Sequence, residues 1–422
     1  MKRKIISLIL TLTISISISS NVFAAENSAA PNISAKAAVA IDANTGEIIY
    51  SKNLDDKVYP ASTTKLLTAL ILTKLKKPND ILTYTPSAKL QPSASLNMDK
   101  KPILPGDKIT ADTALKSMLI YSANDIAEMI AGNLVNDTTS SVSDTNKKFS
   151  VLMNNEVSKL GLKNTHFETP NGLHNPDHYT TAYDMSIIGK NAFANKEILD
   201  TVKLKNYVFK TENGIQIPIE NRNKLILNNL SLYDKTCIGG KTGFTNEAGN
   251  CLVAIFNRDG RTIIGVVMHS NSDSADTQSF KDMEAMINYS YSIQPTNLYS
   301  SNNNVVTKTL SYKPLVFFGP TKTIEVPLKV NKDVQYYKND INDKEKSISI
   351  NLNTKNPWDL KKNTSVGTLA LNERGVTKQF DLYTTLSSSD LIKQNKLLYA
   401  STAAGVIIII GLITLIVRKK NN

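Results

Sequence analysis

The apolar segment near the C-terminus constrains the fold of this 422-residue chain more than any other feature. Residues 399–417 contain no charged side chain, and 19 helical residues at about 1.5 Å each span about 28 Å, which matches the hydrocarbon core of a bilayer. Arg418, Lys419 and Lys420 follow at once, and basic residues favour the cytoplasmic side of a membrane. The pattern predicts one transmembrane helix over 399–417, with the rest of the chain outside the cytoplasm.

The N-terminus has the form of a secretory signal peptide. Residues 1–24 begin with three cations, continue with an apolar stretch and end in the small-residue cleavage site Val22-Phe23-Ala24. A retained N-terminal anchor is the alternative. A cell-wall sorting signal would also explain the C-terminal pattern, but residues 387–398 lack the LPxTG-like site that it needs. We therefore expect a cleaved leader and a permanent single-pass anchor in the cell membrane.

Charge and cysteine content narrow the class further. The net charge is +12, and about +6 remains when the cations at the two ends are set aside. Most of these charges are lysines, which predicts a solvated exterior or an attraction to an anionic envelope polymer or membrane surface, and not to nucleic acid. Cys237 and Cys251 are the two cysteines. An extracytoplasmic location permits a disulfide between them. A single disulfide cannot hold a chain of this length together, so a hydrophobic core must stabilise the fold.

Alternating and apolar patterns predict an α+β architecture. Residues 37–53 read as a hairpin, and strands recur over 234–268 on either side of a turn at Asp259-Gly260. Strands at both ends of a helical middle predict one sheet assembled from distant parts of the chain. The helices are expected at 62–75, 112–134 with a break at Tyr121-Ser122, 147–160 and 276–291, with a long loop over 164–181.

A second, β-rich domain is expected after the first. Residues 294–304 are rich in polar residues and read as a linker. Short alternating segments between turn residues then recur over 305–385, as in KTIEVPLKV and SISINL. The predicted organisation is therefore a first domain over 33–293, a β-rich domain over 305–385 and the membrane segment.

The segment PASTTKLLTAL places Ser62 and Lys65 at the head of an otherwise apolar helix. Positions i and i+3 share one helix face, so the Lys65 amine can reach the Ser62 hydroxyl. Burial lowers the pKa of a lysine, and a neutral amine can accept the proton of a hydroxyl nucleophile. The helix N-terminus adds free N–H groups that favour developing negative charge. Alone, S-x-x-K equally fits a helix cap followed by a surface lysine.

Two further motifs favour the catalytic interpretation. The string YSAND puts Ser122 and Asn124 at a helix break, where both side chains can face one cleft. The string GGKTGFT puts Lys241 and Gly243 on one face of a strand, where a glycine leaves room for a ligand. Alone, the first is an ordinary loop and the second an edge strand with a solubilising lysine.

In this order, S-x-x-K, S-x-N and K-T-G resemble the motifs of the penicillin-recognising serine acyltransferases. Over about residues 35–385 the chain is similar to the low-molecular-mass D-alanyl-D-alanine carboxypeptidases of the penicillin-binding protein 5 type. The resemblance includes NTHFETPNGLHNPDHYTTAYDMSIIG, NRNKLI and GGKTGFTNEAGNCLVA. It implies a β-lactamase/transpeptidase-like catalytic domain, with a sheet flanked by helices, followed by a small β-rich domain and a transmembrane helix.

The resemblance implies the catalytic roles. Ser62 would attack the carbonyl between the two terminal D-alanines of a peptidoglycan stem peptide, with Lys65 as general base. Ser122 and Asn124 would relay the leaving-group proton and hold the substrate amide. Water would then hydrolyse the acyl-enzyme, and β-lactams would acylate the same serine as substrate mimics. The implied role lies in cell-wall biogenesis and cell shape.

The resemblance also implies the substrate-binding residues. Lys241 and Thr242, followed by Gly243, would meet the terminal carboxylate. The backbone N–H groups of Ser62 and Phe244 would form the oxyanion hole, which is typically the largest electrostatic contribution to such a reaction.

Two departures from the family pattern affect this assignment. Some relatives carry an arginine soon after the last apolar strand of the catalytic domain, whereas HSNSDSADTQSF has none, and Arg222 is the candidate replacement. Some relatives carry histidine where this loop has Asn171, so a role for that histidine cannot be transferred. His174 and His178 do not predict a metal site, because Pro176 disfavours a helical pair and no acidic or cysteine cluster completes one. No cofactor is expected.

Three alternatives remain open at the level of sequence. A class A β-lactamase needs a deacylating glutamate, usually in an E-x-x-L-N loop, and no such string lies between Asn124 and Lys241. A DD-endopeptidase would use the same residues and differ only in the leaving group. A membrane-tethered wall-binding protein with an inert centre is the non-enzymatic alternative.

Overall fold

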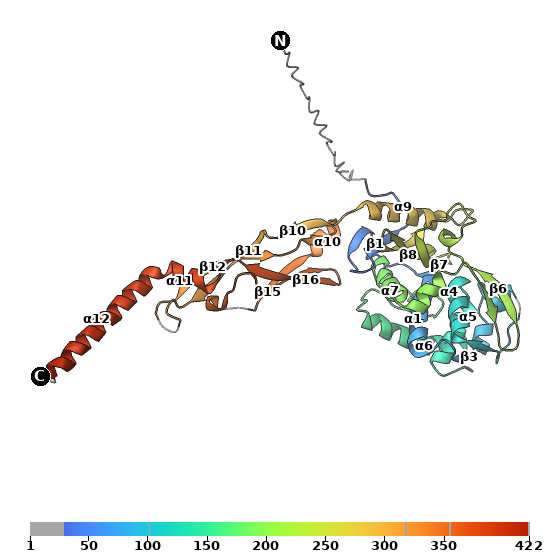
Figure 1. Cartoon of the computed structure of the whole chain (residues 1–422). Helices are drawn as coiled ribbons and strands as arrows, with labels where there is room; N and C mark the ends of the chain where they lie inside the picture. The colour runs from blue at the N-terminus through green and yellow to red at the C-terminus, as the bar shows by residue number, and fades with distance from the viewer. Residues whose placement is uncertain (1–28, 101, 317–318, 354–355, 421–422) are drawn as a thin grey trace, which may run out of the picture.

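The structure, a computed structural model, describes residues 29–100, 102–316, 319–353 and 356–420. The expected signal peptide over 1–24 lies outside these residues. Figure 1 shows a helix-and-sheet part, a β-rich part beside it and a long helix that leads to the C-terminus. The predicted α+β class is confirmed.

A five-stranded antiparallel sheet forms the centre of the first part, with the order β2-β1-β9-β8-β7. Ala37 near the start of the chain pairs with Met268, so the sheet joins distant segments, as predicted. The hairpins at 37–53 and around Asp259-Gly260 are also confirmed. The strands are β1 (Ala37–Asp42), β2 (Ile48–Lys52), β7 (Cys237–Thr245), β8 (Gly249–Arg258) and β9 (Arg261–Ser270).

Helices cover both faces of this sheet, which explains its almost continuous apolar strands. Val253 and Ile264 belong to a core shared with α7 (Ala182–Ala194), whereas Leu252 and Ala254 belong to a core shared with α9. The predicted helix at 276–291 is α9 (Gln278–Ser292). Successive residues of a strand face opposite sides, so a single strand contributes to both cores.

The helix α1 (Lys65–Leu75) lies at the centre of the helical layer, and its residues from Lys65 to Leu72 are buried. It packs against α4, α5, α6 and α7, which is why nearly every face of it is apolar. Ser62 lies just before it, on the 3-10 turn η1 (Ala61–Thr64), and not on the α-helix that the sequence predicted. The predicted break is confirmed, because α4 (Ala111–Ile120) ends before Tyr121 and α5 (Asn124–Leu134) begins after Ser122.

Further helices and strands complete the first part. The helix α6 begins at Val142, earlier than the expected residue 147, because the Ser141 hydroxyl accepts the Asp144 N–H and caps it. These elements are β3 (Ile81–Thr83), α2 (Pro86–Lys89), α3 (Leu96–Asp99), β4 (Lys108–Thr110), α6 (Val142–Lys159), α8 (Lys196–Val202), β5 (Asn206–Lys210), β6 (Gln216–Glu220) and η2 (Lys224–Ile226).

The β-rich part contains a second antiparallel sheet with the order β11-β12-β16-β15-β14. The segment predicted as a linker is partly structured, because β10 (Thr296–Tyr299) pairs with β13 (Val334–Tyr336). The other elements are β11 (Asn304–Tyr312), β12 (Lys322–Val330), α10 (Asp340–Glu345), β14 (Ser347–Leu352), η3 (Pro357–Asp359), β15 (Ser365–Glu373), β16 (Val376–Thr384) and α11 (Ser388–Gln394).

The last helix, α12 (Lys396–Lys420), projects away from the β-rich part (Figure 1). Its mean hydropathy is 2.5 over the most apolar window, and none of its residues is buried. Among the described residues, it is the one helix long and apolar enough to cross a membrane. The helix contains the predicted span 399–417 and begins three residues before it.

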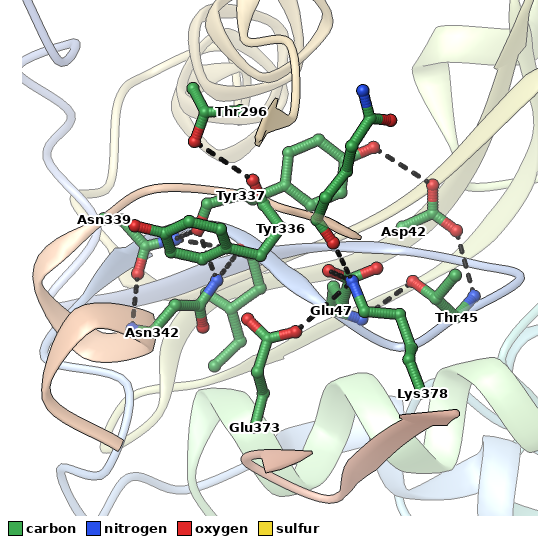
Figure 2. Close-up of polar contacts among 12 residues, drawn as sticks. Asp42, Thr45, Glu47, Thr296, Tyr336, Tyr337, Asn339, Asn342, Glu373 and Lys378 are labelled. Atoms are coloured by element: carbon green, nitrogen blue, oxygen red, sulfur yellow. Dashed lines mark hydrogen bonds and ion pairs between the residues drawn. The ribbon is translucent and has the colours of Figure 1, made fainter. Parts of the chain in front are cut away.

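Polar contacts join the two parts (Figure 2). The Lys378 Nζ on β16 lies 2.5 Å from Glu47 Oε1, beside the β1–β2 turn, and 3.5 Å from Glu373 Oε2 on β15. Asn342 on α10 donates to the Ile48 carbonyl at 2.9 Å. Arg374, at the turn after β15, contacts the carboxylate of Asp55 in the first part at 2.5 Å. The second part is therefore fastened to the hairpin at the edge of the first sheet.

Candidate active site

Ser62 and Lys65 meet at the junction between η1 and α1. The Lys65 Nζ lies 2.8 Å from Ser62 Oγ, as the S-x-x-K spacing predicts. Ser62 is partly exposed in the cleft, whereas Lys65 is fully buried behind it. The backbone is left-handed at Ala61, with φ of +46°, so the turn that presents the serine is strained.

Two further oxygens hold the Lys65 amine. Its Nζ lies 2.8 Å from Asn124 Oδ1 and 2.8 Å from the Asn171 carbonyl. The Asn124 amide is oriented by its own Nδ2, which donates to the Ser93 carbonyl at 3.0 Å. Neither acceptor carries a hydrogen, so a neutral amine donates its two N–H bonds to them and its lone pair faces Ser62. This is the geometry of a base aimed at a hydroxyl nucleophile.

The surroundings of Lys65 favour that neutral form. Burial holds the pKa of Lys65 well below its usual value, and the positive charges of Lys241 and Arg222 lower it further, while Asp125 opposes the shift. A lysine with a lowered pKa can accept the serine proton near neutral pH.

Ser122 and Lys241 form the opposite wall of the site. Ser122 has a φ of +69°, a left-handed backbone that turns the chain between α4 and α5. Its Oγ accepts a hydrogen bond from Lys241 Nζ at 2.9 Å, and the same Nζ donates to the Thr242 carbonyl at 2.9 Å. Lys241 is 1% exposed, and burial followed by the charge of Arg222 holds its pKa well below the usual value.

The strand β7 closes the cleft beside the serine. A Cβ on Gly243 would lie 2.9 Å from the Ser62 nitrogen and 3.0 Å from the Pro60 carbonyl oxygen, so the two backbones approach as only glycine allows. Phe244 follows, and its side chain is 54% exposed. The cleft has a volume of about 760 Å³, and the predicted residues that line it are Ser62, Ser122, Asn124, Arg222, Thr242, Gly243 and Phe244.

Arg222, the candidate replacement for the family's arginine, lies at the wall of the cleft. Its guanidinium carbon lies 4.6 Å from the centre of the Tyr121 ring, in a cation–π arrangement. It lines the cleft and is close enough to lower the pKa values of both buried lysines. Arg222 therefore adds positive charge to the Lys241 side of the cleft.

Two groups that support the site lie outside the sequence motifs. One is the Asn171 carbonyl, which a motif of side chains cannot reveal. The other is the Asp125 carboxylate, which accepts the backbone N–H groups of Leu96 at 3.1 Å and Asn97 at 3.0 Å. The one hint in the sequence was that Asp125 directly follows Asn124 of the S-x-N motif.

Both cysteines and His178 are buried. Cys237 and Cys251 are free and buried, and burial raises the pKa of each thiol to about 12. Cys251 contributes to the cleft wall, whereas Cys237 receives a hydrogen bond from Asn223. His178 is buried against Thr64. In the part of the chain that the structure describes, no three His, Cys, Asp or Glu residues gather as a metal site.

Replacing Gly243 with alanine is expected to slow acylation by penicillin about tenfold to 100-fold, because the new methyl group would push against the Ser62 nitrogen. The measurement is the pseudo-first-order rate of adduct formation by intact mass. Gly411→Ala on α12 is the control, since no atom lies within 4 Å of its added Cβ and its backbone is not left-handed. Acylation of Gly243→Ala at the parent rate would contradict the close approach.

A partly exposed serine beside a buried lysine, opposite a second serine–lysine pair on a sheet edge, is the arrangement expected of serine hydrolases that act through an acyl-enzyme. The D-alanyl-D-alanine carboxypeptidase family model matches residues 24–272. The chain belongs to this family, and it is a serine peptidase.

Individual relatives agree with this assignment. The chain is 28% identical over 346 residues to D-alanyl-D-alanine carboxypeptidase DacF of Bacillus subtilis, covering 81% of this chain and 82% of that protein. It is 30% identical over 281 residues to DacC of Escherichia coli, covering 64% of each. The crystal structure of the Streptomyces K15 DD-transpeptidase superposes with a TM-score of 0.56 at 30% identity, over 63% of this chain and 99% of that one. The predicted family and transpeptidase-like fold are confirmed.

Proposed function

We propose that this chain is a serine-type D-Ala-D-Ala carboxypeptidase that removes the terminal D-alanine from peptidoglycan stem pentapeptides through an acyl-enzyme on Ser62. The observation that carries the proposal is the buried Lys65 amine, which lies 2.8 Å from Ser62 Oγ and is held there by Asn124 and the Asn171 carbonyl. Family membership supports the reaction type.

The acylation step follows from these contacts. Lys65 takes the Ser62 proton as Oγ attacks the carbonyl carbon between the two D-alanines. The backbone N–H groups of Ser62 and Phe244 stabilise the oxyanion. Ser122, which touches Lys241, relays the proton taken up by Lys65 to the departing amine. The C–N bond breaks, D-alanine leaves, and water later hydrolyses the ester to release the shortened peptide.

The substrate carboxylate binds at the Lys241 end of the cleft. Lys241 is buried beside Arg222, and both features disfavour its cation in the free enzyme. A bound carboxylate supplies the missing counter-charge, so the ammonium form of Lys241 and the Thr242 hydroxyl hold it together. Arg222 adds a second positive charge on this side. Asn124 holds the substrate amide, and β-lactams enter the same site as mimics of the terminal dipeptide.

The chain is anchored in the cell membrane by α12, with its catalytic part outside the cytoplasm. The support is an exposed apolar helix that ends in Arg418, Lys419 and Lys420, the pattern of a cytoplasmic flank. We assign residues 33–293 to the catalytic domain, 305–385 to the β-rich domain and 399–417 to the membrane span.

The test uses the full-length protein in detergent with a stem pentapeptide that ends in D-Ala-D-Ala. The expected products are free D-alanine and the tetrapeptide, identified by mass. A penicillin adduct is expected on the proteolytic fragment that contains residues 61–65. Rapid penicillin hydrolysis without D-alanine release would instead indicate a β-lactamase. Neither an adduct nor turnover would indicate an inert wall-binding protein.

A further inference from the structure

His178 lies behind the cleft wall, in the loop between α6 and α7, and is 2% exposed. Its ring packs 4.9 Å from the ring centre of Phe167. It does not line the cleft, so it has no direct access to a substrate. Its two nitrogens nevertheless connect the loop to the helix that carries Lys65.

The partners of His178 fix its tautomer. Its Nδ1 lies 3.0 Å from the backbone nitrogen of Glu168 and 3.2 Å from that of Thr169, and both of these groups donate. Nδ1 therefore carries no hydrogen, and Nε2 donates to Thr64 Oγ1 at 2.9 Å. Burial lowers the pKa of His178 to about 3, so the imidazole stays neutral throughout the working range of the enzyme.

The loop contacts the end of η1 and the start of α1 through three neighbouring hydrogen bonds. His178 binds Thr64, Asn171 binds Lys65 through its carbonyl, and the Pro170 carbonyl accepts the Thr68 hydroxyl at 2.7 Å. A Cβ on Gly172, whose φ is +81°, would lie 1.8 Å from the Ala61 carbonyl oxygen. The loop therefore lies tightly against the start of α1. The position of the Asn171 carbonyl depends on the position of the whole loop.

We propose that His178 is a positioning residue for the general base, because its neutral imidazole holds the loop against Thr64 and so keeps the Asn171 carbonyl on the Lys65 amine. The inference rests on the proposed function. Without the His178 contact, two loop N–H groups and the Thr64 hydroxyl lose their partner, and the carbonyl that aims Lys65 at Ser62 can move. A displacement of about 1 Å at a reacting group can slow a reaction about 100-fold.

The experiment measures two quantities for each full-length variant in detergent: the final fraction that carries a penicillin adduct and the rate at which the adduct forms per active molecule. His178→Ala is expected to reach the parental fraction about 30-fold more slowly. Thr64→Val, which removes the acceptor, is expected to be about tenfold slower, and Thr64→Ser to stay within about twofold. His174→Ala on the same loop is the control and should match the parent.

A merely structural role predicts a different result for His178→Ala. Part of the protein would be inactive, so the labelled fraction would fall while the remaining molecules reacted at the parental rate, and that outcome would overturn the proposal. A rate within twofold of the parent at full labelling would overturn it too.

Hydrogen exchange at the backbone amides of residues 168–169 and 171–173 gives a readout that does not depend on activity. Faster exchange in His178→Ala is expected, and unchanged exchange would overturn the inference even if the parent formed no adduct. Absence of an adduct in the parent would by itself overturn only the proposed function.

Discussion

Replacing Lys65 with methionine is expected to slow acylation of Ser62 by penicillin about 10³-fold at about pH 7.5, because the variant has no base within reach of the serine. The other near neighbours of the serine hydroxyl do not replace it, since Asn171 presents a carbonyl and the Lys241 amine binds Ser122. Methionine has a similar length and no charge, so it relieves the cost of burying an amine. It also leaves the Asn124 and Asn171 oxygens without a donor, and this cost offsets the gain, so the free energy of unfolding is expected to stay within about 2 kcal/mol of the parent.

The measurement pairs adduct formation by intact mass with urea unfolding of the full-length protein. Lys74→Met is the matched control on the same helix, because the Lys74 side chain is 51% exposed and pairs with Glu156, away from the cleft. It should acylate within about twofold of the parent. A rate for Lys65→Met within tenfold of the parent would mean that another group is the base.

The pH dependence of the parent has a definite sign. Only neutral Lys65 is a base, so the acylation rate should rise with pH through the lowered pKa of this lysine and level off well below the usual lysine value. The residual acylation rate of Lys65→Met should not show this rise with pH. A parent rate that keeps rising up to the normal pKa of lysine would contradict the effect of burial.

Sequence patterns predicted most of the first sheet and the catalytic motifs, because both depend on local spacing. The alternation at 37–53 and 249–270 fixes which residues face each core. The i, i+3 spacing brings Ser62 and Lys65 together on a 3-10 turn as it would on an α-helix, and the helix break at Ser122 is visible in the sequence. These features need no knowledge of the rest of the fold.

Features that depend on backbone contacts between distant segments could not be predicted. The Asn171 carbonyl lies 106 residues after Lys65, and a carbonyl has no side-chain identity to recognise. Arg222 stacks on Tyr121 because β6 ends beside the end of α4, which no motif encodes. The sequence of β10 predicts a linker because its partner β13 lies more than thirty residues later and polar residues flank its two hydrophobic residues.

The contact between the two parts should depend on Lys378. Glu47 and Glu373 have side chains only 6% and 2% exposed, and Lys378 is the cation between them (Figure 2). Lys378→Met would leave two buried carboxylates without their positive partner. Such a change destabilises a fold by about 3 kcal/mol. Trp358, the one tryptophan of the chain, lies in the β-rich part, so its fluorescence in urea reports the unfolding of that part. Lys362→Met, at a more exposed pair with Asp390, should stay within about 1 kcal/mol of the parent.

The same cluster should make stability fall as pH rises. Burial, followed by repulsion from Glu47, raises the pKa of Glu373 to about 7, above the usual value of 4.5 in the unfolded chain. Between these values the folded state binds more protons, so this contribution is complete below about pH 4.5 and is lost as pH rises through 7. The expected loss is about 2 kcal/mol between pH 5 and pH 8.

Glu373→Gln should remove this pH dependence of the free energy of unfolding. Glu345→Gln, which weakens the neighbouring Arg374 pair, should keep it. If Glu373→Gln keeps the full pH dependence, another group binds the proton. The Glu47–Glu373 pair is then not the cause of the loss of stability at high pH.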